Sequence, residues 1–248
     1  MPPLQEISQR VFFILWHGDR RSLLLSVLTS LVGGLIVSCQ ALEHEPLHGP
    51  WLMAGMAWAA KIGGAAGIRA NGAQDIAVIK ETTQLPVIGI EKQEDAQGRL
   101  CITPDFAAAR RVAQAGADIV AVDCRHNRPF GEDLAQLIPR IKEELDLLVM
   151  ADIATVDEGK DAEELGVDLV ATTFAFKEGS YGSEPDFPLI EQLTKSLSVP
   201  VIAEGGFWTP EQVVTALDLG VLAVVVGTAI TRPQDITRRF VQAMKSRG

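Results

Sequence analysis

Several polar side chains that could perform acid–base chemistry or hold a substrate follow short apolar runs. Lys92 and Glu204 are suited to proton transfer, because an amine and a carboxyl can each give and accept a proton once their pKa values approach neutral pH. Gln40, Arg69 and Asp152 are suited to hydrogen bonding or ion pairing with a polar substrate. Three of these residues have a structural alternative: Lys92 precedes a polar stretch and could be part of a solvated loop, Arg69 could form a surface ion pair, and Asp152 could cap a helix.

Two glycine-containing segments indicate an anion site. Gly205 and Gly206 follow one apolar run, Gly227 follows the next, and Arg232 lies shortly beyond it. Glycine allows main-chain N–H groups to approach an anion closely, and arginine can bind phosphate through two hydrogen bonds. We therefore expect a phosphorylated small molecule, bound at Gly205, Gly227 and Arg232.

The elements that must position these residues alternate along the chain. Eight β-branched or apolar runs have the length of strands that are buried on both faces. They are Leu35–Ser38, Ala66–Ile68, Val87–Ile90, Ile119–Val122, Leu147–Ala151, Leu169–Ala171, Val201–Ala203 and Ala223–Val226.

Helical patterns lie between the runs, at Pro50–Gly63, Pro104–Ala115, Thr155–Leu165, Asp186–Leu197 and Val213–Leu219. Thr103 and Thr209 each precede a proline, which predicts an N-cap followed by proline at the first helical position. Gly116, Gly166 and Gly220 come just after helical patterns, where a left-handed C-terminal residue favours glycine.

Eight strand–helix units in 248 residues predict a (β/α)8 TIM barrel that forms a single domain over residues 1–248. An open, doubly wound sheet is the structural alternative, but the G-x-G-x-x-G pattern that often follows its first strand is absent from the sequence. Residues 1–31 then form an additional N-terminal helical segment, which either closes the bottom of the barrel or packs on a partner. In a TIM barrel, functional residues gather at the carboxyl ends of the strands, where all the polar residues named above fall.

The composition disfavours several classes of function. The net charge is −10, so we expect no nucleic-acid binding. Cys39, Cys101 and Cys124 have no metal-ligand spacing and indicate a reducing cytoplasm, and no predicted strand ends in histidine, so we expect no metal site. The uncharged stretch Ser22–Leu42 contains a Gly33–Gly34 break, which favours a helix followed by a strand over a membrane span.

The motifs resemble the N-acetylmannosamine-6-phosphate 2-epimerase family from about Gly34 to the C-terminus. The resemblance is carried by Gly34–Leu42, Gly67–Gly72, Met150–Ile153, Ala203–Gly205 and Gly227–Pro233. It implies a cytoplasmic homodimeric TIM barrel without an obligatory organic cofactor. The implied activity interconverts N-acetylmannosamine 6-phosphate and N-acetylglucosamine 6-phosphate during sialic acid breakdown.

The resemblance also implies site residues. The acid/base pair matches Lys92 and Glu204, and the substrate contacts match Gln40, Arg69, Asp152 and Arg232. The chain departs from the family pattern at Gln93 and Gly206, where arginine is common, and in the loop Phe174–Ser183.

The expected reaction removes the proton at C2 of the ring-opened sugar and returns it on the opposite face. Lysine titrates near ~10.4 when unperturbed, so Lys92 must have its pKa lowered toward roughly 7–8 by desolvation or by Arg69. Two alternatives remain open at this stage. One is a class I aldolase, in which Lys92 forms a Schiff base, and the other is a non-catalytic phosphosugar-binding barrel.

Overall fold

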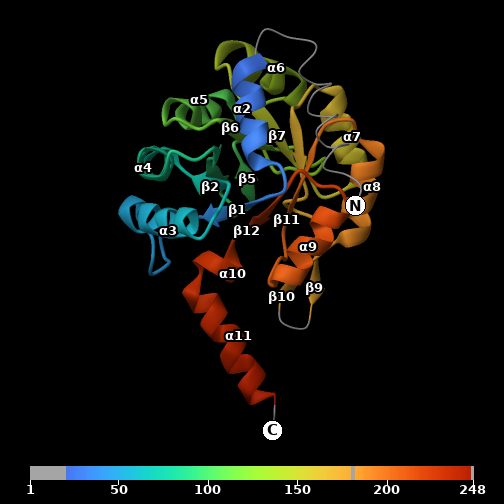
Figure 1. Cartoon of the computed structure of the whole chain (residues 1–248). Coiled ribbons are helices and arrows are strands. Elements are labelled where there is room, and N and C mark those ends of the chain that lie inside the picture. The colour runs from blue at the N-terminus through green and yellow to red at the C-terminus, as the bar shows by residue number, and fades with distance from the viewer. Residues whose placement is uncertain (1–20, 180–181, 247–248) are drawn as a thin grey trace.

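A closed barrel of parallel strands forms the centre of the molecule (Figure 1). The structure is a computed structural model and describes residues 21–179 and 182–246. The barrel strands are β1 (Gly34–Cys39), β2 (Gly67–Asn71), β3 (Val87–Ile90), β6 (Ile119–Asp123), β7 (Leu148–Asp152), β8 (Leu169–Ala171), β11 (Val201–Glu204) and β12 (Ala223–Val226). Their order around the barrel is β1-β12-β11-β8-β7-β6-β3-β2. Every predicted run overlaps one of these strands, which confirms the predicted (β/α)8 fold.

Helices surround the barrel and connect its strands (Figure 1). They are α3 (Pro50–Ile62), α4 (Ala73–Thr83), α5 (Phe106–Gln114), α6 (Leu134–Glu144), α7 (Val156–Glu164), α8 (Phe187–Ser196) and α9 (Pro210–Asp218). Two further helices, α10 (Thr228–Thr231) and α11 (Pro233–Lys245), follow the last strand. Among the described residues, no helix is long and apolar enough to span a bilayer.

The predicted helix ends are confirmed with one correction. Thr209 is the N-cap of α9, and its hydroxyl accepts a hydrogen bond from the Gln212 N–H. Thr103 and Pro104 were wrongly predicted as the N-cap and first residue of α5: Asp105 is the N-cap and accepts from the Ala108 N–H, and the helix begins at Phe106. Thr103 instead has a φ of 48° and bonds Glu91 through its main chain and its hydroxyl.

Two antiparallel hairpins extend the carboxyl ends of barrel strands. The first joins β4 (Lys92–Glu94) to β5 (Leu100–Ile102) just after β3. The second joins β9 (Phe176–Gly179) to β10 (Gly182–Pro185) after β8. Both hairpins therefore belong to the end of the barrel where functional residues were expected.

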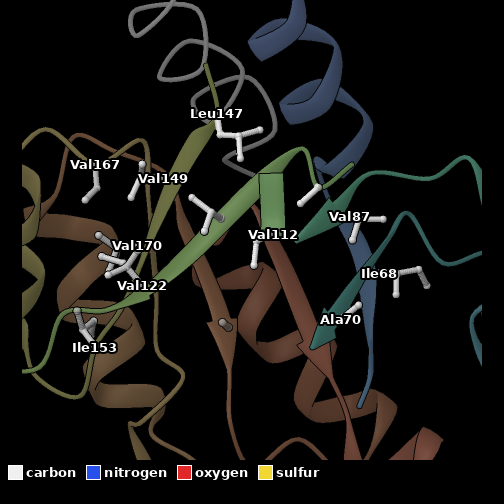
Figure 2. Packing of buried hydrophobic residues seen from close by; sticks show 14 of the residues in the cluster. Ile68, Ala70, Val87, Val112, Val122, Leu147, Val149, Ile153, Val167 and Val170 are labelled. Carbon is white, nitrogen blue, oxygen red and sulfur yellow. The ribbon is translucent and has the colours of Figure 1, made fainter. Parts of the chain in front are cut away.

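Alternate residues of each strand face different apolar layers. In β7, Val149 and Ala151 join the layer between barrel and helices, part of which Figure 2 shows. Leu148 and Met150 join the layer inside the barrel. Because side chains on a strand alternate between its two faces, the next residue, Asp152, also faces the interior.

The helix α2 (Arg21–Leu31) closes the bottom of the barrel. Val27, Leu28 and Leu31 are buried with residues that begin barrel strands, such as Ile119 and Leu169. In Figure 1, α2 lies at the end of the barrel opposite α10 and the β9–β10 hairpin. The structure thus places Arg21–Leu31 of the predicted N-terminal segment on the barrel, and residues 1–20 of that segment lie outside the described residues.

Candidate active site

Strand alternation directs the candidate site residues into the barrel. In β2, Ile68 and Ala70 belong to the outer apolar layer, so Arg69 between them points inward. In β11, Ile202 belongs to the inner layer, which places Glu204 on the same face two residues later. The same phase brings Asp152 inward, so local strand geometry brings three charged residues together from distant parts of the sequence.

A cavity of about 420 Å³ opens at the carboxyl ends of the strands. Its lining residues are Ser38, Gln40, Lys92, Thr173, Phe176, Glu204, Gly205, Gly206, Phe207, Trp208, Val225, Gly227, Thr228, Thr231 and Arg232. Most of the predicted site residues are in this lining. The exceptions are Arg69 and Asp152, which are fully buried and ion-paired to each other beside the cavity residue Glu204.

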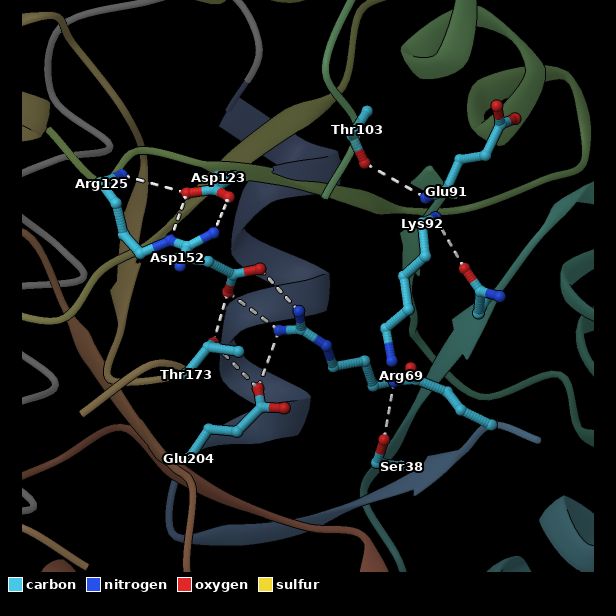
Figure 3. A network of polar contacts seen from close by, with 12 residues as sticks. Ser38, Arg69, Glu91, Lys92, Thr103, Asp123, Arg125, Asp152, Thr173 and Glu204 are labelled. Carbon is cyan, nitrogen blue, oxygen red and sulfur yellow. Dashed lines mark hydrogen bonds and ion pairs between the residues drawn. The ribbon is translucent and has the colours of Figure 1, made fainter. Parts of the chain in front are cut away.

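A buried ion-pair network connects Arg69 to two carboxylates (Figure 3). The Arg69 guanidinium donates to Asp152 over 2.6 Å and 3.0 Å, in a two-bond arrangement. It also donates to Glu204 Oε2 over 2.7 Å. The Thr173 hydroxyl donates to Asp152 Oδ1 over 2.5 Å and reaches Glu204 Oε2 at 3.4 Å. One cation is therefore shared between two carboxylates.

Lys92 lies in a setting that favours a neutral amine. Its main-chain N–H donates to Asn71 Oδ1 over 2.9 Å, which fixes the start of β4. Burial and the positive charges of Arg69 and Arg232 together lower the pKa of Lys92 to about 8, against the opposing effect of the Glu204 and Asp152 carboxylates. This direction agrees with the requirement that a lysine base lose its proton near neutral pH.

Glu204 is shifted in the opposite direction. The pKa of Glu204 is raised to about 7, mainly by burial and also by the neighbouring Asp152 carboxylate, against the attraction of Arg69 and Lys92. The amine and the carboxyl therefore approach each other in pKa, so a proton can reside on either at similar free energy.

Lys92 and Glu204 come from opposite walls of the barrel. Lys92 follows β3 and Glu204 ends β11, and three strands separate β3 from β11 in either direction around the closed sheet. Figure 3 shows the two side chains extending from different sides toward the same space. A small molecule in the cavity would lie between an amine and a carboxyl.

Two buried polar atoms at the site have no partner among the described residues. They are Gln40 Oε1 and Arg69 Nε. Gln40 uses its amide nitrogen to donate to Ser38 Oγ over 2.7 Å, which leaves its carbonyl oxygen unpaired. Leaving such atoms unpaired is unfavourable in a folded protein, and a bound polar ligand is one way to satisfy them.

The predicted anion site lies on the β12 side of the cavity. Gly205, Gly227 and Arg232 all line it, as expected. The Arg232 guanidinium donates to Glu45 Oε2 over 3.0 Å and keeps 28% of its side chain exposed. Its charge also contributes to the lowered pKa of Lys92, so Arg232 and Lys92 influence each other electrostatically.

The cavity contains residues that the sequence analysis did not select. Thr173 bridges the two carboxylates, and its position two residues after the run Leu169–Ala171 was the signal that could have identified it. Phe176, Phe207 and Trp208 form an aromatic part of the lining; Phe176 begins β9 and the other two lie between β11 and α9, where the sequence has no comparable signal.

The departures from the family pattern have a structural basis. A Cβ atom on Gly206, which has a φ of 77°, would lie 2.4 Å from the main chain of Glu184 in β10. The β9–β10 hairpin therefore occupies the space that an arginine side chain would need. Gln93 donates to Glu91 Oε1 over 2.8 Å and is not part of the cavity lining.

The described residues contain no group of three or more histidines, cysteines, aspartates or glutamates that could hold a metal ion. The polar groups at the cavity are instead suited to proton transfer and to anion binding.

Comparisons with known proteins agree with this geometry. Residues 53–246 match the model of the family described as "Putative N-acetylmannosamine-6-phosphate epimerase". A relative from Caldanaerobacter subterraneus subsp. tengcongensis, named "Putative N-acetylmannosamine-6-phosphate 2-epimerase", is 52% identical over 90% of this chain and 96% of its own. One of the same name from Clostridioides difficile is 48% identical over 88% of this chain and 99% of its own.

A solved structure supports the same assignment. The N-acetylmannosamine-6-phosphate 2-epimerase from Clostridium perfringens superposes with a TM-score of 0.80 at 44% identity, covering 87% of this chain and 95% of its own. The fold, the cavity and this level of identity over nearly the whole length show that the chain belongs to the N-acetylmannosamine-6-phosphate 2-epimerase family.

Proposed function

We propose that the protein interconverts N-acetylmannosamine 6-phosphate and N-acetylglucosamine 6-phosphate by proton transfer at C2, in the breakdown of sialic acid and amino sugars. The observation that carries the proposal is the placement of Lys92 and Glu204 on opposite walls of one cavity. Inversion at a carbon requires removal of a proton from one face and its return to the other. Two groups with pKa values near 8 and 7 can perform these steps near neutral pH.

The substrate supplies the activation that the reaction needs. In the open-chain sugar, C2 is adjacent to the C1 aldehyde, so loss of its proton gives an enolate that the carbonyl stabilises. Either Lys92 or Glu204 accepts this proton, and the other group returns one from the opposite face. No cofactor is required in this scheme, because the carbonyl itself makes C2 acidic.

The remaining site residues bind and orient the sugar. The unpaired Gln40 carbonyl oxygen can accept a hydrogen bond from a hydroxyl or amide group. Arg69 and Asp152 hold Glu204 in place through the buried network. Gly205, Gly227 and Arg232 receive the 6-phosphate, because glycine leaves the main chain accessible and arginine supplies charge.

Proton NMR in deuterium oxide tests the proposal directly. The purified protein should convert N-acetylmannosamine 6-phosphate to N-acetylglucosamine 6-phosphate with deuterium at C2, because the base exchanges the captured proton with solvent. Product that keeps a fully protiated C2 would refute exchange with solvent, and absence of product would refute the activity.

A class I aldolase remains the rival enzyme, because the lowered pKa of Lys92 also suits a Schiff-base lysine. Borohydride treatment in the presence of the sugar phosphate distinguishes the two. The epimerase proposal predicts no mass increment on Lys92, whereas an aldolase would retain the reduced substrate. Turnover in the NMR assay likewise separates an enzyme from a barrel that only binds the phosphosugar.

We further propose that the protein is a homodimer. Helix α11 has no buried residue and projects from the barrel (Figure 1). Its Phe240 and Met244 are 69% and 73% exposed, and Trp51 and Ile62 of α3 are 77% and 72% exposed. These apolar surfaces are suited to burial against a second copy. Light scattering should give a dimer mass, and Phe240→Glu should lower it to that of a monomer.

We place the enzyme in the cytoplasm, where its free thiols persist. Cys39, Cys101 and Cys124 are all buried and unpaired in the described structure. A reducing compartment keeps such thiols from oxidation. Fractionation of the source cells, followed with the epimerase assay, tests the placement, and activity in an exported fraction would contradict it.

A further inference from the structure

Glu45 connects two parts of the chain at the anion side of the cavity. It lies in the segment between β1 and α3, and its side chain is 10% exposed. Its Oε2 accepts hydrogen bonds from the Leu42 main-chain N–H over 2.6 Å and from Arg232 over 3.0 Å. Its Oε1 accepts from the Gln234 amide over 2.9 Å. Both oxygens of one carboxylate are therefore used to fix neighbouring groups.

These contacts determine where the Arg232 guanidinium lies. Arg232 joins α10 to α11, and its long side chain has many rotamers when it is unrestrained. Glu45 holds one nitrogen of the guanidinium, and Arg232 at the same time lines the cavity. The Leu42 N–H in turn anchors the carboxylate itself, so the guanidinium is held by a residue that is itself fixed.

We propose that Glu45 is a positioning residue that holds Arg232 in place for the substrate phosphate. The proposal rests on the proposed function in that it takes Arg232 as the phosphate ligand. Glu45 does not line the cavity, and it acts through the arginine. Ordering the side chain before the ligand arrives removes part of the entropy that binding would otherwise lose.

Hydrogen bonding and charge lead to different expectations for Glu45. A glutamine at this position keeps an oxygen for Leu42 and Arg232, and Gln234 can turn its amide to accept from the new NH2 group. Glu45→Gln therefore keeps the positioning contacts and removes the negative charge. Glu45→Ala removes both.

The test is a comparison of KM and kcat with N-acetylmannosamine 6-phosphate. Glu45→Ala should raise KM about five- to tenfold, the loss expected when a long side chain must be ordered on binding. Its kcat should stay within about threefold, since Lys92 and Glu204 are untouched. Glu45→Gln should keep KM within about twofold of the wild-type value. Glu191→Ala, which removes an exposed ion pair with Lys195 on α8, is the matched control.

A double-mutant cycle shows whether Glu45 acts through Arg232. In the Arg232→Ala background, Glu45→Ala should change KM by no more than about twofold, because the group that it positions is gone. An equal effect in both backgrounds would overturn the proposal. So would an unchanged or lowered KM in Glu45→Ala, or a KM in Glu45→Gln as high as in the alanine variant.

Direct binding of inorganic phosphate separates this proposal from the proposed function. Calorimetry should show weaker binding to Glu45→Ala than to the wild-type protein or Glu45→Gln, whether or not the protein epimerises sugars. If Glu45→Ala fails to fold, Gln234→Ala removes one of the groups that fixes the same carboxylate. That variant should weaken phosphate binding in the same direction by a smaller factor, and unchanged binding would count against the proposal.

Discussion

The pH dependence of kcat/KM should reflect the pKa values of Lys92 and Glu204, which lie beside the buried Arg69–Asp152 ion pair. Proton transfer between two faces needs one proton on the Lys92–Glu204 pair: with two protons no base is present, and with none no acid is present. The profile of kcat/KM should therefore be bell-shaped, falling below about pH 7 as Glu204 gains its proton and above about pH 8 as Lys92 loses its proton. These limits belong to the coupled pair.

Asp152→Asn should move both limits to lower pH. The Asp152 carboxylate raises the pKa of Glu204 and also raises that of Lys92, so loss of its charge lowers both. Asp152 and Glu204 both accept from the same Arg69 nitrogen, over 3.0 Å and 2.7 Å. Two unit charges about 6 Å apart in an effective dielectric constant of ~20 interact by roughly 2.8 kcal/mol, or about two pKa units, and the two accepting oxygens lie closer than that because they share one nitrogen. Because each charge is spread over two oxygens, we expect a shift of about one to two units in the acid limit.

The assay is kcat/KM across pH, compared between the wild-type protein and Asp152→Asn. The position of the acid limit is informative even if kcat falls, because it does not depend on the maximum rate. Asp118→Asn is the control, since Asp118 pairs with Lys80 at the opposite end of the barrel and should leave the limits in place. An acid limit that stays fixed or moves to higher pH in Asp152→Asn would refute the electrostatic reasoning.

The other predictions concern catalysis, phosphate binding and folding. Lys92→Ala and Glu204→Gln should each lower kcat by about 10²–10⁴-fold, and near-normal turnover in either would remove that group from the mechanism. Arg232→Ala should lower kcat/KM, mainly by raising KM, by a factor that corresponds to a loss of roughly 1.5–3 kcal/mol in transition-state stabilisation. An unchanged KM would place the phosphate elsewhere. Gly206→Arg should lower the Tm, because even its Cβ would lie 2.4 Å from the main chain of β10. An unchanged Tm would show that the β9–β10 hairpin can move to accommodate the side chain. Leu31→Ala should lower the free energy of unfolding in urea by about 2–5 kcal/mol, because Leu31 is fully buried against the barrel, and a smaller loss would show that α2 contributes little.

The sequence predicted the barrel strands because their signal is local. A strand buried on both faces produces a continuous apolar run, and each run was followed by the polar residues that end the strand. The same rule identified Lys92, Glu204 and Arg232, which the structure brings to one cavity. Their individual roles stay predictions.

Features that depend on distant contacts were not accessible in this way. Arg69 and Asp152 are 83 residues apart, and no local pattern shows that they bury each other completely. Thr103 failed as a predicted N-cap because the β4–β5 hairpin uses it to bond Glu91. Both hairpins are short and partly polar, so they lack the apolar periodicity that identified the barrel strands.

The ion pairs at the two ends of the barrel differ in a way that explains the candidate site. At the bottom, Lys80 pairs with Asp118 and Lys142 pairs with Asp168, one cation to one carboxylate. At the mouth, Arg69 forms ion pairs with both Asp152 and Glu204. Arg69 and Asp152 are fully buried, and the Glu204 side chain is 14% exposed. In the network at the mouth, burial raises the pKa of Glu204 and the neighbouring Asp152 carboxylate raises it further, against the attraction of the shared Arg69. Glu204, the carboxylate with the raised pKa, is the one that lines the cavity. The burial that makes its charged form costly therefore also makes Glu204 suitable for proton transfer near neutral pH.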